Sequence, residues 1–265
     1  MRRTLSRFWL WRLPAAVATL AALAFGVGFV FALRGSWGDP IGDTPPPPAL
    51  KSPPIKKSGR RFLLVLGDSI SRGTGDENGK GYAVDVGDAI RKRGPADVAN
   101  LAVNGAESGD VLEVVKTPNS ARLAASADWI VFSAGGNDLS HAVPRVASSA
   151  AAPLEAIAGA RSAFVSNLRE ILTRLREANP SAPIYVVGLY DPFGNVGPQG
   201  RVGSSVIRTW NSLLEETALA FPGVTVVPTF DLFYGRPDRL AADHFHPNAA
   251  GHQAIADRVI QLLPP

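Results

Sequence analysis

Short apolar runs alternate with helix-length amphipathic segments along residues 61–265, and this alternation limits the possible folds more than any other feature of the chain. The apolar runs lie at 62–66, 96–103, 128–135, 183–190 and 224–230. The helix-length segments lie at 80–93, 107–117, 153–180, 203–220 and from about Pro247 onward. Strictly alternating strands and helices predict an α/β fold, a three-layer α/β/α sandwich around one mostly parallel five-stranded sheet.

Polar motifs follow these apolar runs at the places where parallel sheets bind ligands, beyond the C-terminal ends of the strands. They are "GDS" at 67–69, "NG" at 104–105 and "GGND" at 135–138, and "DHFHPN" at 243–248 precedes the last helical segment. The fold would therefore deliver a serine, a glycine, an asparagine and an Asp-His pair to one edge of one sheet. These are the groups that acyl transfer requires.

The four motifs, in this order, resemble the four sequence blocks of the GDSL/SGNH hydrolases. The resemblance covers about residues 61–265, and its first block reads "GDSIS", with Ile70 where the family name has leucine. It implies an SGNH, flavodoxin-like fold and a serine esterase that uses no cofactor. The longer stretch "GDSISRGTGDENGKGYAVDV" is similar to the lysophospholipase-like branch of that family.

The resemblance also implies a role for individual residues. By position it assigns Ser69 as the nucleophile and His246 as the general base, with Asp243 orienting the imidazole. The oxyanion donors would be the backbone N–H groups of Ser69 and Gly105 and the side-chain amide of Asn137. A glycine lets a substrate oxygen approach its N–H closely, and an asparagine amide donates hydrogen bonds without adding a charge.

Each of these motifs also has a purely structural interpretation. A serine after a strand can sit in a turn or cap a helix, and an Asn-Gly pair is common in turns. Asp68 is interpreted as the anchor of its own turn rather than as a catalytic acid, and Asp138 as a cap. It is the presence of all four motifs together that favours the catalytic interpretation of Ser69.

Two histidines near the C-terminus raise the alternative of a metal site. In an extended segment His244 and His246 would point the same way, as two zinc ligands could. A third ligand would have to come from His141, from His252 or from scattered carboxylates. We therefore predict no metal ligands.

Two other function classes account for fewer of these residues. A phosphate-binding loop at "GDSISRGTG" would lack the GKS/T ending of a P-loop and would leave Asn137 and His246 without a role. A non-catalytic, membrane-tethered binding module would have no need to keep the serine, glycine, asparagine, aspartate and histidine together.

The net charge of +4 is uneven along the chain. Residues 1–60 contain nine Lys/Arg and two Asp/Glu, whereas residues 61–265 contain 18 and 21. The basic character belongs to the N-terminal tail, so it does not predict a nucleic-acid partner. The chain has no cysteine, which excludes disulfides, thiol catalysis and cysteine-bound zinc.

Residues 13–33 form an uncharged run of 21 residues, long enough to span a bilayer as a helix at ~1.5 Å per residue. Four arginines precede it and one follows closely, which predicts an N-terminus inside the cytoplasm. We expect residues 1–33 to be a cytoplasmic tip and a transmembrane signal-anchor, 34–60 a proline-rich linker, and 61–265 an extracytoplasmic hydrolase domain. The alternative is a signal peptide cleaved near "ALA" at 22–24, and secretion.

Together these features predict a membrane-anchored serine esterase that acts on lipid or other carboxylic acyl esters. The alternative within the same chemistry is an O-acetyl esterase or acyltransferase on a cell-envelope polysaccharide. Loops at 141–152, 191–203 and 231–242 are expected to shape the substrate pocket.

Overall fold

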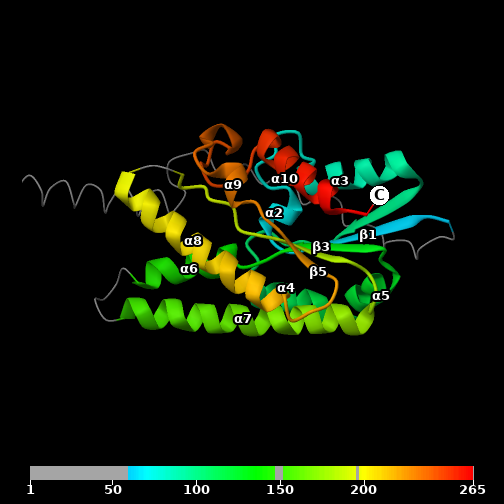
Figure 1. The fold of residues 1–265 in the computed structure, drawn as a ribbon, viewed down its shortest axis with the longest axis horizontal. Coiled ribbons are helices and arrows are strands. Elements are labelled where there is room, and N and C mark those ends of the chain that lie inside the picture. The colour runs from blue at the N-terminus through cyan, green and yellow to red at the C-terminus, as the bar shows by residue number, and fades with distance from the viewer. Residues whose placement is uncertain (1–58, 147–151, 195–196, 265) are drawn as a thin grey trace, which may run out of the picture. The chain divides into compact units, whose positions relative to one another are not determined.

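A wholly parallel sheet lies at the centre of the part of the chain that the structure describes, residues 59–146, 152–194 and 197–264 (Figure 1). In this computed structural model the strands are β1 (Arg61–Leu66), β2 (Ala96–Asn100), β3 (Trp129–Ser133), β4 (Ile184–Val187) and β5 (Val224–Val227). They lie in the order β2-β1-β3-β4-β5, and each neighbouring pair is parallel. The predicted five-stranded sheet is confirmed, with no antiparallel strand among the described residues.

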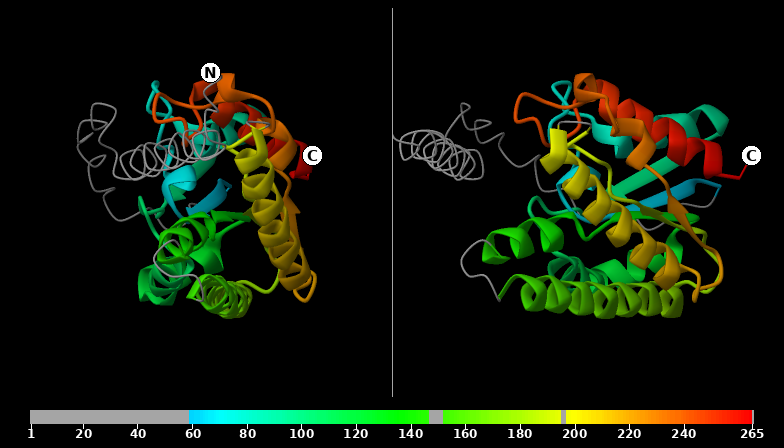
Figure 2. Two further views of the ribbon diagram at one scale, coloured as in Figure 1. Left: turned by 90° about the vertical axis from the view of Figure 1, so that its left-hand side faces the viewer. Right: turned by 60° about the vertical axis from the view of Figure 1, so that its left-hand side comes forward.

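Helices cover both faces of this sheet, as the sequence predicts. On one face lie α3 (Gly81–Arg93) and α10 (Ala249–Leu262). On the other face lie α4 (Ser108–Lys116), α5 (Pro118–Ser126), α7 (Ala152–Ala178) and α8 (Gly197–Ala218). Figure 2 shows the same layers from two other directions, with α3 and α10 on the opposite side of the sheet from α7.

The two cores follow from the alternation of side chains along the strands. In β1, Leu64 packs into the core beneath α7, whereas Leu63 and Val65 pack beneath α3 and α10. In β3, Phe132 and Trp129 divide in the same way, and both are buried as the sequence predicts. Strands buried on both faces explain why these segments read as continuous apolar runs.

Several predicted loops contain helices instead. The additional elements are α2 (Ser69–Arg72), α6 (Gly136–Val146), α9 (Phe230–Phe233) and the 3-10 helix η1 (Pro237–Arg239). Thus α6 occupies the start of the predicted loop 141–152, and α8 begins at Gly197, inside the predicted loop 191–203. Pro198 lies in the first turn of α8. A proline is compatible with that position, because an N–H there would have no partner within the helix.

Four strands end earlier than the apolar runs that predict them. They are β2, β3, β4 and β5, which stop at Asn100, Ser133, Val187 and Val227. Beyond β2 the chain still runs beside β1, because the N–H groups of Leu101 and Val103 donate to carbonyls of β1 and its exit turn at 2.8 and 2.9 Å. The apolar residues past each strand end therefore belong to the loops at the sheet edge and do not lengthen the sheet.

The predicted anchor at 13–33 lies outside the described residues, as does the linker at 34–60 except for its last two residues. No helix in the described part of the chain is both long enough and apolar enough to cross a bilayer. All described residues belong to one unit, Ser52–Pro265.

Candidate active site

Ser69 begins α2 directly after β1, at the C-terminal edge of the sheet. Asp68 is the N-cap of this helix, and its carboxylate accepts the N–H of Ile70 at 3.0 Å. Gly67 has φ +123°, and a Cβ there would lie 2.4 Å from the carbonyl oxygen of Ser133. The turn therefore requires a glycine, and the prediction that Asp68 anchors it is confirmed.

A buried hydrogen-bond network supports the nucleophile from below. The Ser133 hydroxyl donates to Asp68 Oδ1 at 2.5 Å and lies 2.9 Å from the Ser71 hydroxyl. Ser71 Oγ in turn lies 2.6 Å from the hydroxyl of Tyr82 on α3. Burial raises the pKa of Asp68, although the bonds from Ser133 and Ile70 oppose that shift. This network fixes the backbone on both sides of Ser69.

His246 stands between Ser69 and Asp243. Its Nε2 lies 3.1 Å from Ser69 Oγ, across 177 residues of sequence, and its Nδ1 lies 2.5 Å from Asp243 Oδ2. The other carboxylate oxygen, Oδ1, accepts the backbone N–H groups of Phe245 and His246 at 3.0 and 2.9 Å. With Nδ1 protonated toward the carboxylate, Nε2 is the acceptor for the serine proton, the arrangement that activates a hydroxyl nucleophile.

Hydrogen bonds keep the Asp243 carboxylate ionised. Partial burial acts to raise the pKa of this carboxyl, but hydrogen bonds from the His246 side chain and from two backbone N–H groups outweigh it and lower the pKa to about 2. The carboxylate therefore remains ionised throughout the neutral and mildly acidic range. An ionised carboxylate at Nδ1 holds the imidazole in one tautomer and stabilises the imidazolium that forms during reaction.

The three predicted oxyanion donors come to the same edge of the sheet. Within the described residues, the backbone N–H groups of Ser69 and Gly105 donate to no protein acceptor. The Asn137 amide donates one hydrogen to the carbonyl of Ala106 at 2.9 Å, which ties it to the turn of Gly105 and leaves a second hydrogen. The exit of β2 is tied to the nucleophile turn, because the N–H of Val103 donates to Gly67 O at 2.9 Å.

Gly105 needs its lack of a side chain for a conformational reason. Its φ is +74°, which other residues rarely adopt, and the space that a Cβ would occupy is open. The N–H is thus presented at an uncrowded surface beside the nucleophile turn.

Asp138 lies in the first turn of α6 and is not the N-cap of α4, which is Glu107; it binds the first residue of that helix instead. Its carboxylate accepts both the backbone N–H of Ser108, at 2.8 Å, and the Ser108 hydroxyl. Ser108 is the first residue of α4, and its hydroxyl also accepts from Asn167 of α7 at 3.0 Å. Burial raises the pKa of Asp138 against these bonds. The residue after Asn137 therefore ties α6 to α4 and α7.

The extended geometry expected for His244 and His246 is wrong. Residues 242–246 form turns and bends; His244 has φ 55°, is exposed, and donates its N–H to the carbonyl of Ala241 at 2.9 Å. The backbone between the two histidines is therefore not that of a strand, on which both side chains would point the same way. In the described part of the chain, no three His, Cys, Asp or Glu side chains gather closely enough to hold a metal ion.

Tyr190 is a site residue that the sequence alone did not single out. The apolar pattern places it in a strand, but β4 ends at Val187, and the Tyr190 hydroxyl donates to the carbonyl of Phe245 at 2.7 Å. This bond holds the segment just before His246. Its ring packs against Phe233 with centroids 4.6 Å apart. The signal in the sequence was an aromatic residue at the C-terminal end of the apolar run 183–190.

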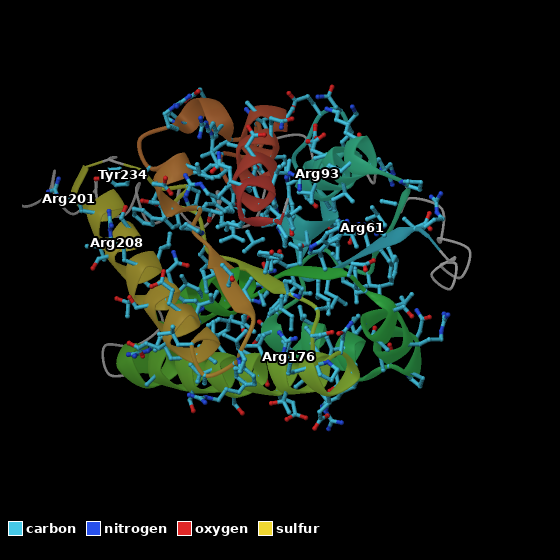
Figure 3. The ribbon with its side chains drawn as sticks, turned by 45° about the vertical axis from the view of Figure 1, so that its right-hand side comes forward. Arg61, Arg93, Arg176, Arg201, Arg208 and Tyr234 are labelled. Atoms are coloured by element: carbon cyan, nitrogen blue, oxygen red, sulfur yellow. The ribbon has the colours of Figure 1, made fainter. Side chains whose placement is uncertain are left out.

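Aromatic residues of the loops expected to shape the pocket take different positions. Phe233 is buried in the core, whereas Phe193 and Tyr234 are 48% and 40% exposed. Arg208 lies over the Phe230 and Tyr234 rings, 3.9 and 5.8 Å from their centroids. Figure 3 shows Arg208 and Tyr234 at the end of the molecule opposite Arg61, the first residue of β1. They therefore lie toward the C-terminal edge of the sheet.

Comparisons with known proteins found related sequences and structures. A sequence model of the GDSL-like Lipase/Acylhydrolase family matches residues 65–254. YpmR of Bacillus subtilis is 31% identical over 207 residues, which cover 76% of this chain and 80% of that protein. The GDSL lipase Rv0518 of Mycobacterium tuberculosis is 27% identical over 213 residues, with the same two coverages, 76% and 80%. Among solved structures, the lipase Lip_vut3 from a goat rumen metagenome aligns with a TM-score of 0.67 at 22% identity, covering 75% of this chain and 95% of its own.

Proposed function

Because the chain belongs to the GDSL-like lipase/acylhydrolase family, we propose that it hydrolyses carboxylic acyl esters through a Ser69-His246-Asp243 triad. The observation that carries this proposal is the pair of contacts made by one imidazole, 3.1 Å to Ser69 Oγ and 2.5 Å to Asp243 Oδ2. An activated serine hydroxyl is the nucleophile that acyl transfer needs.

In the first half of the reaction, Ser69 Oγ attacks the ester carbonyl carbon while its proton passes to His246 Nε2. The carbonyl oxygen becomes an oxyanion, which the N–H groups of Ser69 and Gly105 and the second amide hydrogen of Asn137 stabilise. Loss of one such donor typically lowers kcat by ~10²–10³-fold. The intermediate collapses when His246 returns the proton to the leaving alcohol, which leaves an acyl group on Ser69.

In the second half, water takes the place of the alcohol. His246 accepts a proton from the water as it attacks the acyl carbon, and then returns that proton to Ser69 Oγ as the carboxylic acid leaves. Asp243 remains ionised throughout, since its pKa is lowered to about 2. It stabilises the imidazolium in both halves.

We assign esters of apolar acyl groups, lipids among them, as the substrate class. Phe193, Val202 and Tyr234 expose apolar surface on segments that follow β4 and β5, with exposed fractions of 48%, 66% and 40%. Apolar surface exposed on segments that follow strand ends, where parallel sheets bind ligands, favours an apolar ligand. One relative, the GDSL lipase Rv0518, agrees with this class.

We further propose that the chain is anchored in a membrane by residues 13–33, with residues 61–265 outside the cytoplasm. The support is the uncharged run of 21 residues and the four arginines before it. A C-terminal reporter that works only outside the cytoplasm should be active. An active cytoplasmic reporter at the same position would reverse this orientation.

The function is tested with p-nitrophenyl esters of increasing acyl length, run beside a lysophospholipid and an acetylated glycan. The full chain should cleave the acyl esters, and Ser69→Ala should remove nearly all turnover while the protein remains folded. Ser212→Ala is the matched control, because that hydroxyl is exposed on α8 and donates to the carbonyl of Arg208. A folded Ser69→Ala protein that kept a tenth of the activity would exclude the serine mechanism, and cleavage of the glycan alone would exclude the substrate class.

A further inference from the structure

The segment from Gly73 to Gly81, the first residue of α3, connects α2 to α3. The proposed reaction assigns it no role. Its sequence, "GTGDENGKG", continues directly from the nucleophile motif. Its hydrogen bonds reach three separate parts of the active site. We refer to residues 73–81 as the brace loop.

Thr74 makes three of these contacts with three different groups of its own. Its N–H donates to the carbonyl of Ser69 at 3.0 Å, and its hydroxyl donates to Asn104 Oδ1 at 2.9 Å. Its carbonyl accepts from Nε2 of His252 on α10 at 3.0 Å. One residue thus connects the nucleophile, the turn that carries Gly105, and the helix that follows the base.

The next residue lies directly against the base. Gly75 has φ +93°, and a Cβ there would lie 2.7 Å from the Cβ of His246 and 2.4 Å from the carbonyl oxygen of Pro247. Contact this close is possible only for glycine. The position of the brace loop therefore limits where the His246 segment can lie.

The brace loop is itself held at several points. His252 is fully buried, and its Nδ1 accepts the N–H of Tyr82 at 3.3 Å, so that Nε2–H donates to Thr74. Burial lowers the pKa of His252 and keeps it neutral, as this pair of bonds requires. Asp76 accepts the N–H of Gly81 at 2.7 Å, and Glu77 accepts the N–H of Ala249 at 3.0 Å. The loop is thereby attached to α3 and α10.

From these contacts we propose that Thr74 is a positioning residue, which holds the Asn104–Gly105 turn relative to Ser69 and so directs the Gly105 N–H at the substrate oxygen. The proposal rests on the proposed function, since it concerns the oxyanion hole of that reaction. A β-branched side chain has few χ1 rotamers, so its hydroxyl is presented in a defined direction. Functional groups must be held within about 0.5 Å of the productive geometry, and a displacement of about 1 Å can lower the rate ~10²-fold.

The experiment removes the Thr74–Asn104 bond from each side. Thr74→Val keeps the shape of the side chain but not its hydroxyl, Thr74→Ser keeps the hydroxyl, and Asn104→Ala removes the acceptor. The Asn104 backbone is outside the left-handed region, so alanine is compatible there. Thr209→Val is the matched control, because its hydroxyl is exposed on α8 and donates to the carbonyl of Ser205.

Each full-length variant is compared in kcat, in KM, in thermal stability and in the number of active sites titrated to completion with an organophosphonate. We expect Thr74→Val and Asn104→Ala each to lower kcat about 10-fold per titrated site, with KM changed less than about twofold. Thr74→Ser should recover most of kcat, and Thr209→Val should match the wild type. The double variant should lose no more than either single variant, because both remove the same bond.

Three results would overturn the proposal. The first is a kcat for Thr74→Val within about twofold of wild type per titrated site. The second is an equal loss in Thr74→Ser, and the third is additive losses in the double variant. If Thr74→Val does not fold, Asn104→Ala and Thr74→Ser decide the question by the same criteria. A wild-type protein without esterase activity would instead contradict the proposed function, so the two failures are distinguishable.

Discussion

Replacing Asp243 by asparagine is the sharpest test of the triad, because the structure predicts how the new amide would be oriented. Oδ1 accepts two backbone N–H groups, from Phe245 and His246, at 3.0 and 2.9 Å. Only the carbonyl end of an asparagine amide can take that position. The NH₂ group must then face His246 Nδ1, where the carboxylate oxygen stands at 2.5 Å.

The expected loss has two parts. The pKa of Asp243 is lowered from its ordinary 3.8 to about 2. That shift sets an upper limit of roughly 2 kcal/mol, or about 30-fold in kcat, on the lost stabilisation of the imidazolium, because the two backbone N–H groups supply part of it. The second part is the tautomer, because an amide donor at Nδ1 moves the ring proton to Nε2, which can then no longer accept the serine proton. With both parts, Asp243→Asn should lower kcat about 10³-fold or more, though less than loss of the base.

The assay measures kcat on a p-nitrophenyl ester together with the ¹⁵N chemical shifts of His246. The wild type should show a protonated Nδ1, and the variant a protonated Nε2. A kcat reduced less than about tenfold would refute the orienting role of Asp243. A large loss with the wild-type tautomer retained would refute the orientation argument.

The remaining predictions concern the base, the brace loop and acid stability. His246→Ala should lower kcat by several orders of magnitude, whereas His244→Ala, at an exposed position, should stay close to wild type. If both variants were equally inactive, and a chelator also abolished wild-type activity that added zinc restored, a metal site would replace the triad. Gly75→Ala should destabilise the protein by about 2–4 kcal/mol, because the new Cβ would overlap His246 and Pro247 and the φ is left-handed. Gly79→Ala, where the space is open, should cost about 1 kcal/mol. Both values are measured by urea unfolding. Since folding lowers the pKa of Asp243 to about 2, its stabilising contribution is present above pH ~4 and is lost as the pH falls toward that value. The difference in unfolding free energy between wild type and Asp243→Asn should therefore shrink over that interval, and a constant difference would contradict the assignment.

The sequence by itself predicted the parallel sheet covered by helices on both faces and most of the candidate-site residues, but not Tyr190. Apolar runs such as 62–66 report burial on both faces, and burial on both faces occurs in parallel sheets whose strand ends gather at one edge. Asp243 and His246 are three residues apart, so a local turn is enough to join them. The capping role of Asp68 was also accessible, because this helix cap depends on near neighbours.

Only the tertiary structure decided the contacts between distant segments. The 3.1 Å approach of His246 to Ser69 spans 177 residues and depends on the strand order, which no local pattern contains. The turn at His244 contradicts the extended geometry. It is closed by the bond from the His244 N–H to the Ala241 carbonyl, and the Tyr190 hydroxyl, from a distant segment, binds the carbonyl of Phe245 beside it. Thr74 likewise reads as an ordinary loop residue, and its position at the junction of three site segments arises only when α10 packs beside α3. Periodicity reports which residues are buried, whereas the identity of the partner that buries them is set by the packing of the whole chain.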